Sequence, residues 1–367
     1  MRGRLITIEG LDGVGKTTLG EALAAAVRKR GPAGAGKRGV ARAFAAELLA
    51  DGAPDPASVR LRVARGVHPD LTWVEPSGAA EMLVSDVQEP VIAGATRTPF
   101  EARRRVFVLE RAETMSDQVA NKLLKTLEEP PAFAHLVLLT SRPGDLLDTV
   151  ASRCQHVRFD APPVEEVAAA LVAQGVAAEA ARACARLSLG DAERARALAL
   201  GDGPALRAGG EELARAALRD DLGARPWLEV LRVARRRGED EQERVARDTA
   251  AALELLPKRD HRRAEREGAD AARRANRRAR TAALDLALTV CGLWLRDVGC
   301  VADGAEDVAH ATDRLGALRQ DAAGRDVHRL REAVAVVDDT RAALVMLNAT
   351  EELALEALAS RLGRLLS

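Results

Sequence analysis

The stretch that decides the fold runs from Arg105 to Thr140. It reads RVFVLE at residues 105–110, continues through a helical pattern from Met115 that ends in LLKTLEEPP at 123–131, and closes with HLVLLT at 135–140. The two apolar runs are continuous rather than alternating, which is typical of strands buried on both faces of a parallel sheet. The helical segment between them provides the crossover that parallel neighbours need. These residues therefore predict an α/β layer structure with a parallel sheet.

The segments on either side extend this prediction. Residues 69–74 and 155–159 read as further strands and 40–50 as a helix, and Pro162-Pro163 then interrupts the pattern. Everything beyond reads as helix, because apolar residues recur at three- and four-residue intervals. We expect a domain boundary at residue 162 and another at 204, and thus α/β followed by all-α. The expected later helices are 164–174, 177–187, 191–200, 205–220, 226–237, 243–256, 281–295, 326–347 and 350–366.

Two phosphate-loop sequences precede this region, GLDGVGKT at 10–17 and GPAGAGKR at 31–38. The first has the strand–loop–helix context that such a loop needs, since residues 4–8 read as a strand and 18–30 as an amphipathic helix. Lys16 would neutralise the outer phosphates and the Thr17 hydroxyl would coordinate Mg²⁺. We therefore expect ATP with Mg²⁺ at this loop. The expected nucleotide-binding residues are Gly10, Asp12, Gly13, Gly15, Lys16, Thr17 and Thr18.

The second loop looks degenerate. Helical sequence precedes it, and Arg38 stands where the metal-binding hydroxyl belongs, although a guanidinium has no lone pair for a metal. The strand at 105–110 likewise ends in Glu110-Arg111, so a cation occupies the position at which a second carboxylate would orient the attacking water. We expect no hydrolysis at this site. Its remaining elements are Gly31, Gly34, Gly36 and Lys37 of the loop and Glu110 as a degenerate Walker B residue.

Two families are recognisable. Residues 8–18, IEGLDGVGKTT, resemble the opening of thymidylate kinase, and this resemblance ends near Arg30. It implies phosphorylation of dTMP by ATP, but neither an arginine-bearing acceptor segment nor any tyrosine follows, and phosphoryl transfer depends on groups that position the acceptor. The rest of the chain resembles the delta-prime subunits of the bacterial DNA polymerase III clamp loader, which belong to the AAA+ family. LEEPP at 127–131 and Ser152-Arg153-Cys154, the SRC motif, carry this resemblance in the right order.

The second resemblance implies a domain plan and a set of partners. It implies an AAA+ core at 31–161, a helical lid at 162–203 and a helical collar for oligomerisation at 204–367, after a kinase-like segment at 1–30. It also implies a cytoplasmic protein that assembles with gamma/tau-like ATPases and a delta-like subunit, and through them with the sliding clamp and primer-template DNA. The resemblance further implies a non-hydrolysing subunit in which Arg153 serves as an arginine finger in the ATP site of the neighbouring subunit. The alternative is an arginine that pairs with a carboxylate or caps a helix.

The composition limits which binding functions and metal sites this chain can have. The chain of 367 residues has 55 basic and 55 acidic residues and 2% aromatics, so neither a general attraction to nucleic acid nor a base-stacking platform is expected. The four cysteines lack CxxC spacing and none lies within 51–68, so we expect no zinc or other metal site apart from the Mg²⁺ that accompanies ATP, and we interpret the thiols as small buried hydrophobes. No membrane span is expected. The arginine-rich stretch 258–280 is interpreted as a solvated helix, with contact to DNA phosphates as the alternative.

The kinase-like segment meets the delta-prime-like part of the chain at residues 30 and 31, and this suggests one structural hypothesis. Residues 4–8 take the place of a missing central strand, the first loop then lies at the nucleotide position, and the second loop becomes a connector between two helices. The alternative is that residues 1–30 dock outside the domain. Three functions thus stand open: a non-catalytic clamp-loader subunit, a thymidylate kinase, and a stand-alone AAA+ ATPase.

Overall fold

The computed structural model describes residues 3–8, 37–77, 81–129, 131–159, 162–253, 258–346 and 349–366. These residues form two compact units. The first comprises Met1–Glu166 with Gly190–Ala192, and the second comprises Val167–Leu189 with Glu193–Ser367. The α/β class of the first part and the helical class of the second are as predicted. The lid and collar boundaries within the second unit stay predictions.

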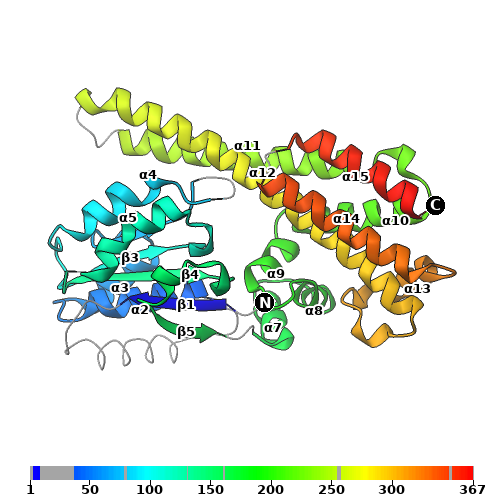
Figure 1. The fold of residues 1–367 in the computed structure, drawn as a ribbon, viewed down its shortest axis with the longest axis horizontal. Coiled ribbons are helices and arrows are strands. Elements are labelled where there is room, and N and C mark those ends of the chain that lie inside the picture. The colour runs from blue at the N-terminus through cyan, green and yellow to red at the C-terminus, as the bar shows by residue number, and fades with distance from the viewer. Residues whose placement is uncertain are drawn as a thin grey trace. The chain divides into compact units, whose positions relative to one another are not determined.

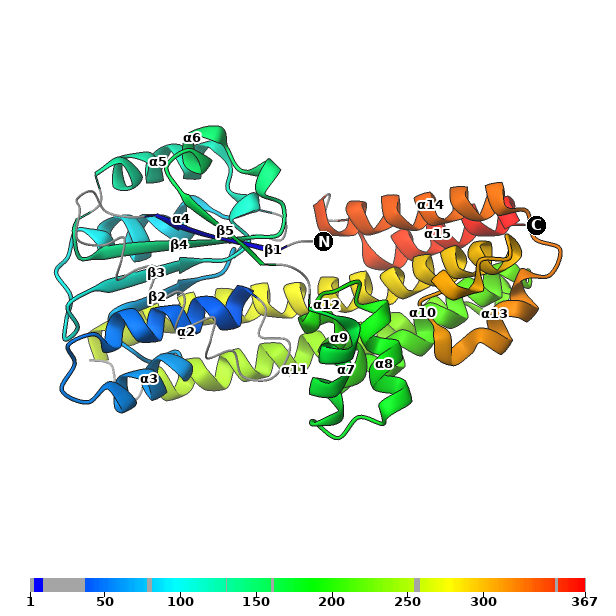
Figure 2. The ribbon, with the colours of Figure 1, turned by 90° about the horizontal axis from the view of Figure 1, so that it is seen from below.

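The first unit is a five-stranded sheet with helices on both faces (Figure 1). The strand order is β2-β3-β4-β1-β5, and β2, β3 and β4 are parallel neighbours. Figure 2 shows α2 and α3 on one side of the sheet and α5 and α6 on the other. The strands are β1 (Gly3–Ile8), β2 (Leu71–Val74), β3 (Arg105–Leu109), β4 (Ala134–Thr140) and β5 (Gln155–Phe159). The helices are α2 (Lys37–Ala50), α3 (Pro56–Ala64), α4 (Val84–Val87), α5 (Asp117–Glu128) and α6 (Asp148–Ala151), with a π-helical turn at Gln88–Ala93 after α4.

The two faces of β3 explain its continuous apolar sequence. Successive side chains of a strand point to opposite faces. Val106 and Val108 pack into the cluster that contains Phe44 of α2. Phe107 and Leu109 pack into the other cluster, with residues of α5 such as Leu123. Because helices cover both faces, the buried positions from Val106 to Leu109 are all apolar, and the one polar residue of β3 is Arg105 at its start.

β1 occupies the central position that the sequence predicts, but in the opposite direction. It lies between β4 and β5 and is antiparallel to both, with Arg4 opposite Thr140 and Ile8 opposite Leu136. The sheet is therefore mixed rather than wholly parallel. Because Ile8 lies beside the start of β4, the chain leaves β1 at the edge opposite the carboxyl ends of β3 and β4. The expectation that this strand carries the first loop toward those carboxyl ends is wrong, although the loop itself lies outside the described residues.

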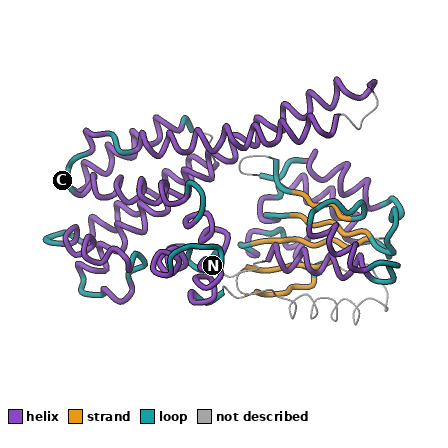
Figure 3. The backbone as a smooth tube through the Cα atoms, turned by 180° about the vertical axis from the view of Figure 1, so that it is seen from behind, coloured by secondary structure: helices purple, strands orange, loops and turns teal. Residues whose placement is uncertain are grey.

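The second unit is helical, and its longest helices form a hairpin. The predicted helices at 226–237 and 243–256 are one helix, α11 (Trp227–Leu253), and the arginine-rich stretch joins the predicted helix at 281–295 in α12 (Lys258–Ala302). Figure 3 shows these two helices side by side. Small residues allow the close approach, since a Cβ on Gly268 would lie 2.2 Å from Thr249 of α11. The other helices are α7 (Val164–Val172), α8 (Ala178–Leu187), α9 (Ala192–Ala199), α10 (Gly203–Leu218), α13 (Leu315–Ala322), α14 (Val327–Met346) and α15 (Glu351–Leu366).

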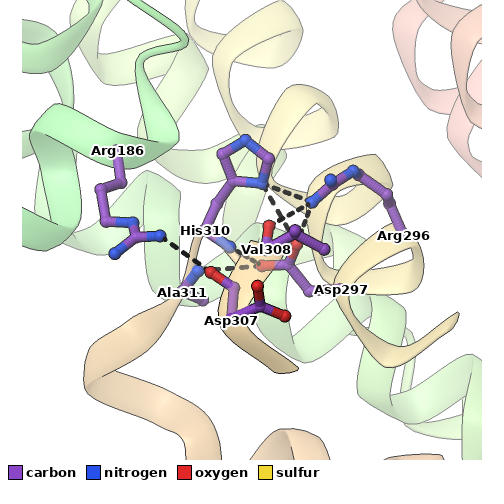
Figure 4. Close-up of polar contacts among 7 residues, drawn as sticks. All are labelled: Arg186, Arg296, Asp297, Asp307, Val308, His310 and Ala311. Carbon is purple, nitrogen blue, oxygen red and sulfur yellow. Dashed lines mark hydrogen bonds and ion pairs between the residues drawn. The ribbon is translucent and has the colours of Figure 1, made fainter. Parts of the chain in front are cut away.

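A buried carboxylate fixes the segment that follows α12 (Figure 4). Asp297 of α12 is fully buried, and its Oδ2 accepts the backbone N–H groups of His310 at 2.8 Å and Ala311 at 2.9 Å. Its Oδ1 accepts a hydrogen bond of 2.7 Å from Arg296 Nη1, which also donates to the carbonyl of Val308 at 3.1 Å. One side chain thus satisfies two backbone donors that would otherwise be buried without acceptors.

Asp70 plays a similar part in the first unit and predicts a pH dependence. It is buried, and its carboxylate accepts backbone N–H groups from Phe100 at 2.6 Å and from Glu101 and Ala102 at 2.9 Å. Burial alone would raise the pKa of Asp70, but these three hydrogen bonds hold the pKa below its ordinary value. Because the folded-state pKa is lowered, the ionised carboxylate stabilises the fold at pH values above about 4, the ordinary pKa of an aspartate. This contribution is lost as the pH falls through the folded-state pKa.

We therefore expect Asp70→Asn to lower the free energy of unfolding by about 2 kcal/mol at neutral pH, because a neutral amide replaces a charged acceptor. The deficit should shrink as the pH is lowered below roughly 4, because the Asp70 carboxyl of the unfolded wild type then takes up a proton, and it should vanish once the pH is below the lowered pKa of the folded state. Urea unfolding of both proteins at pH 7 and pH 3 measures the difference. A deficit of equal size at both pH values would contradict this account.

Candidate functional site

The carboxyl ends of β2, β3 and β4 and the first turn of α2 meet at one edge of the sheet. Glu75 follows β2, Glu110 follows β3 and Ser141 follows β4, while α2 begins at Lys37. Lys37 Nζ donates a hydrogen bond to Ser141 Oγ. Ligands of α/β proteins bind at this edge, and the first turn of a helix adds free N–H groups and a positive dipole. These residues are suited to bind a phosphate group at this edge of the sheet. The lysine that reaches the edge is Lys37, which belongs to the second loop.

Arg38 lies between the carboxylates of Glu75 and Glu110. Its Nε is 2.6 Å from Oε1 of Glu110, and its Nη2 is 2.7 Å from Oε1 of Glu75. Trp73 Nε1 donates to the same oxygen of Glu110 at 2.5 Å. Glu110 is only 9% exposed, so its charge needs a partner. The guanidinium supplies between these two carboxylates the kind of positive charge that Mg²⁺ would bring.

Arg111 gives the neighbouring position a second cation. Its backbone is left-handed, with φ of 49°, and it is exposed. Its carbonyl accepts hydrogen bonds from the backbone N–H of Thr114 at 2.8 Å and from the Thr114 hydroxyl at 2.7 Å, so the turn is fixed. A guanidinium stays protonated and cannot act as a general base. This edge can therefore attract an anion, but Arg111 cannot activate water for hydrolysis.

The SRC segment lies between α6 and β5, and the structure joins it to the LEEPP segment. Arg153 Nη2 is 2.7 Å from Oε1 of Glu128, the last residue of α5. Arg153 Nη1 also donates to the carbonyl of Thr149 at 2.8 Å. The arginine side chain is 36% exposed and the glutamate 49%, so this ion pair is accessible to solvent. The two motifs that carry the delta-prime resemblance are thus in direct contact.

The other two residues of the SRC segment have local roles. Cys154 donates from Sγ to the carbonyl of Val150 at 3.0 Å and packs against the core. Burial raises the pKa of the Cys154 thiol to about 12, so it stays protonated at neutral pH and is a poor nucleophile. Ser152 Oγ donates to the carbonyl of Thr149 at 3.3 Å. Ser152 and Arg153 are the exposed residues of this segment, and Arg153 is its charged side chain.

The structure brings together only part of the predicted site. Lys37 and Glu110 lie at the edge described above, and Arg153 lies in a separate segment. The sequence alone did not identify several residues of the site, namely Trp73, Glu75 and Ser141, nor the contact of Glu128 with Arg153. Glu75 and Ser141 could have been found, because each directly follows a strand. The residues that lie outside the described part are Gly10, Asp12, Gly13, Gly15, Lys16, Thr17 and Thr18 of the first loop and Gly31, Gly34 and Gly36 of the second.

The arginine-rich stretch is mostly exposed on α12. Arg262, Arg266 and Arg277 are exposed, and Arg273 pairs with Asp270. Its interpretation as a solvated helix, and the DNA alternative, stay predictions. Within the described ranges, no group of three or more His, Cys, Asp and Glu is arranged to hold a metal ion. In the same part of the chain, no helix combines the length and the apolar character that crossing a membrane would take.

Comparison with known proteins supports the delta-prime resemblance. Residues 12–163 match the sequence model of the family described as "DNA polymerase III, delta subunit". The delta' subunit of DNA polymerase III from Pseudomonas aeruginosa is 39% identical over 34% of this chain and 39% of its own length. The delta' subunit from Bacillus subtilis is 34% identical over 43% of this chain and 50% of its own length, and that from Escherichia coli is 35% identical over 37% and 41%.

The chain thus spans half or less of the length of these curated relatives. The family match begins inside the first phosphate loop, at residue 12, and ends just after β5. It therefore covers β2 to β5, most of the first loop, the second loop and the SRC segment, but neither β1 nor the second unit. The kinase-like interpretation of residues 1–30 stays a prediction.

Proposed function

We propose that this chain is a delta-prime-type subunit of a DNA polymerase III clamp loader, and that it contributes Arg153 to the ATP site of a neighbouring subunit. The observation that carries the proposal is the solvent-accessible guanidinium of Arg153, held at 2.7 Å from Glu128 between the two motifs shared with that family. The similarity of residues 12–163 to delta-type subunits supports the same conclusion. The partners are gamma/tau-type ATPases and a delta-type subunit, and through them the sliding clamp and primer-template DNA.

Arginine suits this role for two physical reasons. Its guanidinium stays ionised at all physiological pH values, and its planar fork of donors matches the oxygens of a phosphate. Charge that develops on the γ-phosphate during transfer is stabilised by such a group when it is supplied from a neighbouring protein. The contact with Glu128 holds the side chain extended in the free subunit, and exchanging that carboxylate for a triphosphate keeps the arginine paired with an anion throughout.

The subunit itself does not hydrolyse ATP in this proposal. Arg38 takes the place of the metal ion between Glu75 and Glu110, and Arg111 replaces the base that would activate water. An anion can still be held near Lys37 and the first turn of α2, so binding without turnover is compatible with the site. Nucleotide binding by the first loop, through Lys16 and Thr17, is a separate proposal that rests on its sequence alone.

A coupled assay for ADP release by the isolated chain tests this proposal against its alternatives. We expect no turnover with ATP alone, because Arg111 cannot act as a base, and none when dTMP is added, because the sequence lacks the arginine-bearing acceptor segment of a thymidylate kinase. Release of ADP that depends on dTMP would establish the kinase instead, and release without an acceptor would establish a stand-alone ATPase.

Assembly gives the positive test. The tagged chain should retain gamma/tau-type and delta-type clamp-loader subunits when they are mixed at equal concentrations and purified together. Failure to retain any of them would overturn the proposal even if the isolated chain proved inactive.

A further inference from the structure

A cavity in the second unit has no part in the proposed function. Its volume is about 560 Å³, within the ~300–1,000 Å³ typical of ligand sites. One wall is a face of α15, where the lining positions recur at helical intervals of three and four residues. The opposite wall is the segment from Asp220 to Trp227, which connects α10 to α11. The α15 wall consists of Glu356, Ala359, Ser360, Gly363 and Arg364.

The connecting segment is held in an unusual conformation. Asp220 and Arg225 both have left-handed backbones, with φ of 57° and 52°. Such residues cost about 1 kcal/mol or more each when they are not glycine, and they cluster at ligand sites. Gly363 lets the segment approach α15 closely, because a Cβ there would lie 3.3 Å from Cδ1 of Leu222. The two walls therefore form a defined groove.

The groove carries hydrogen-bond donors that the described residues do not use. Trp227 lines it and is 6% exposed, and its indole N–H is buried without an acceptor among those residues. A buried unpaired donor is unfavourable by about 1–3 kcal/mol, so a small opening of the wall that lets an acceptor reach this N–H is favoured. Arg225 and Arg364 are exposed on the two walls. Two guanidiniums and one indole N–H around one cavity fit a carboxylate.

We propose that this groove binds an extended peptide segment of a partner protein, with an acidic side chain placed between Arg225, Arg364 and Trp227. The rest of the lining suits a peptide rather than a free anion. Asp220 and Glu356 would repel a second negative charge but can accept backbone N–H groups, and Leu222 and Ala359 give an apolar floor. The proposal is independent of ATP turnover and of the assignment of Arg153.

Nuclear magnetic resonance of the indole N–H groups of the full chain tests the proposal. The chain has three tryptophans, and the signal of Trp227 is assigned by its absence in Trp227→Phe, or by elimination with Trp73→Phe and Trp294→Phe together. Acetyl-Ala-Glu-Ala-amide should shift this signal saturably, whereas acetyl-Ala-Gln-Ala-amide should not. Arg364→Gln should weaken binding roughly tenfold, the effect of losing one charged hydrogen bond.

Arg361→Gln is the matched control, since Arg361 also lies exposed on α15 but pairs with Asp339 at 3.4 Å rather than lining the groove. It should bind the glutamate peptide as the wild type does. Equal shifts with both peptides, no shift with either, or equal weakening by both arginine substitutions would overturn the proposal. A saturable shift with inorganic phosphate and none with the glutamate peptide would replace the peptide with a phosphate ligand and overturn it as well.

Discussion

Replacing Arg153 with alanine should lower ATP turnover at the neighbouring site of a reconstituted clamp loader by roughly a thousandfold, while the assembly stays intact. Arginine fingers supplied by one protein to another have effects of about this size or larger, because they stabilise charge that develops only in the transition state. The rest of the ring should keep its turnover, so the measurement must follow a loader in which the other sites are inactivated. Steady-state ADP release and size-exclusion chromatography give the two readouts.

A structural role for Arg153 predicts a different result. The ion pair with Glu128 is solvent-accessible, and such pairs contribute about 0–1 kcal/mol to stability. Arg60→Ala is the matched control, because Arg60 is 43% exposed and pairs with Glu47 at 2.9 Å in the same unit. Both substitutions should leave the unfolding midpoint nearly unchanged, and only Arg153→Ala should slow turnover. Undiminished turnover with Arg153→Ala would remove the finger assignment.

Glu128→Gln distinguishes positioning from charge. Arg153 keeps its charge in this variant but loses the carboxylate that orients it. We expect turnover to change by at most about fivefold, the factor that corresponds to an exposed ion pair. A loss as large as that of Arg153→Ala would show that Glu128 itself has a direct role in the neighbouring site.

The sequence predicted the first unit well because its strands are buried on both faces. The runs at 105–110, 135–140 and 155–159 correspond to β3, β4 and β5 with shifts of at most one residue at each end. The direction of β1 could not be predicted, because a short apolar run fits either orientation and the choice depends on its neighbours. α3 was missed although Asp55 and Pro56 give a helix start, with the Asp55 carboxylate accepting the N–H groups of Ala57 and Ser58.

In the candidate site, sequence motifs identify single unusual residues but not the residues that they contact. A departure from a motif can be read at one position, and Arg38 was identified in this way as unsuited to a metal. Its consequence depends on residues that are distant in the chain, since Glu75 and Glu110 come from the ends of two different strands. The pairing of Arg153 with Glu128 is of the same kind, because it joins residues that are 25 positions apart. Tertiary contacts of this type leave no periodic signal in a sequence.

Asp297→Ala should have the largest effect on stability among the substitutions considered, a loss of about 3–5 kcal/mol from the second unit. The substitution leaves Arg296 without its closest carboxylate and the buried N–H groups of His310 and Ala311 without acceptors. Hydrogen exchange should accelerate at these two amides first, because the segment they belong to is held by this one side chain. The unfolding midpoint in urea should fall in parallel.

Asp338→Ala is the control for this loss, since Asp338 is 58% exposed and pairs with Arg341 at 2.8 Å on the surface of α14. It should change stability by less than about 1 kcal/mol. Equal effects of the two substitutions would contradict the assigned role of Asp297.

The consequence of Asp297→Ala for function also differs from that of Arg153→Ala. Arg186 of α8 donates to the carbonyl of Asp307 at 3.4 Å, so loosening this segment loosens the link between α8 and α12. Asp297→Ala should therefore reduce the amount of assembled loader, whereas turnover per assembled loader should not change.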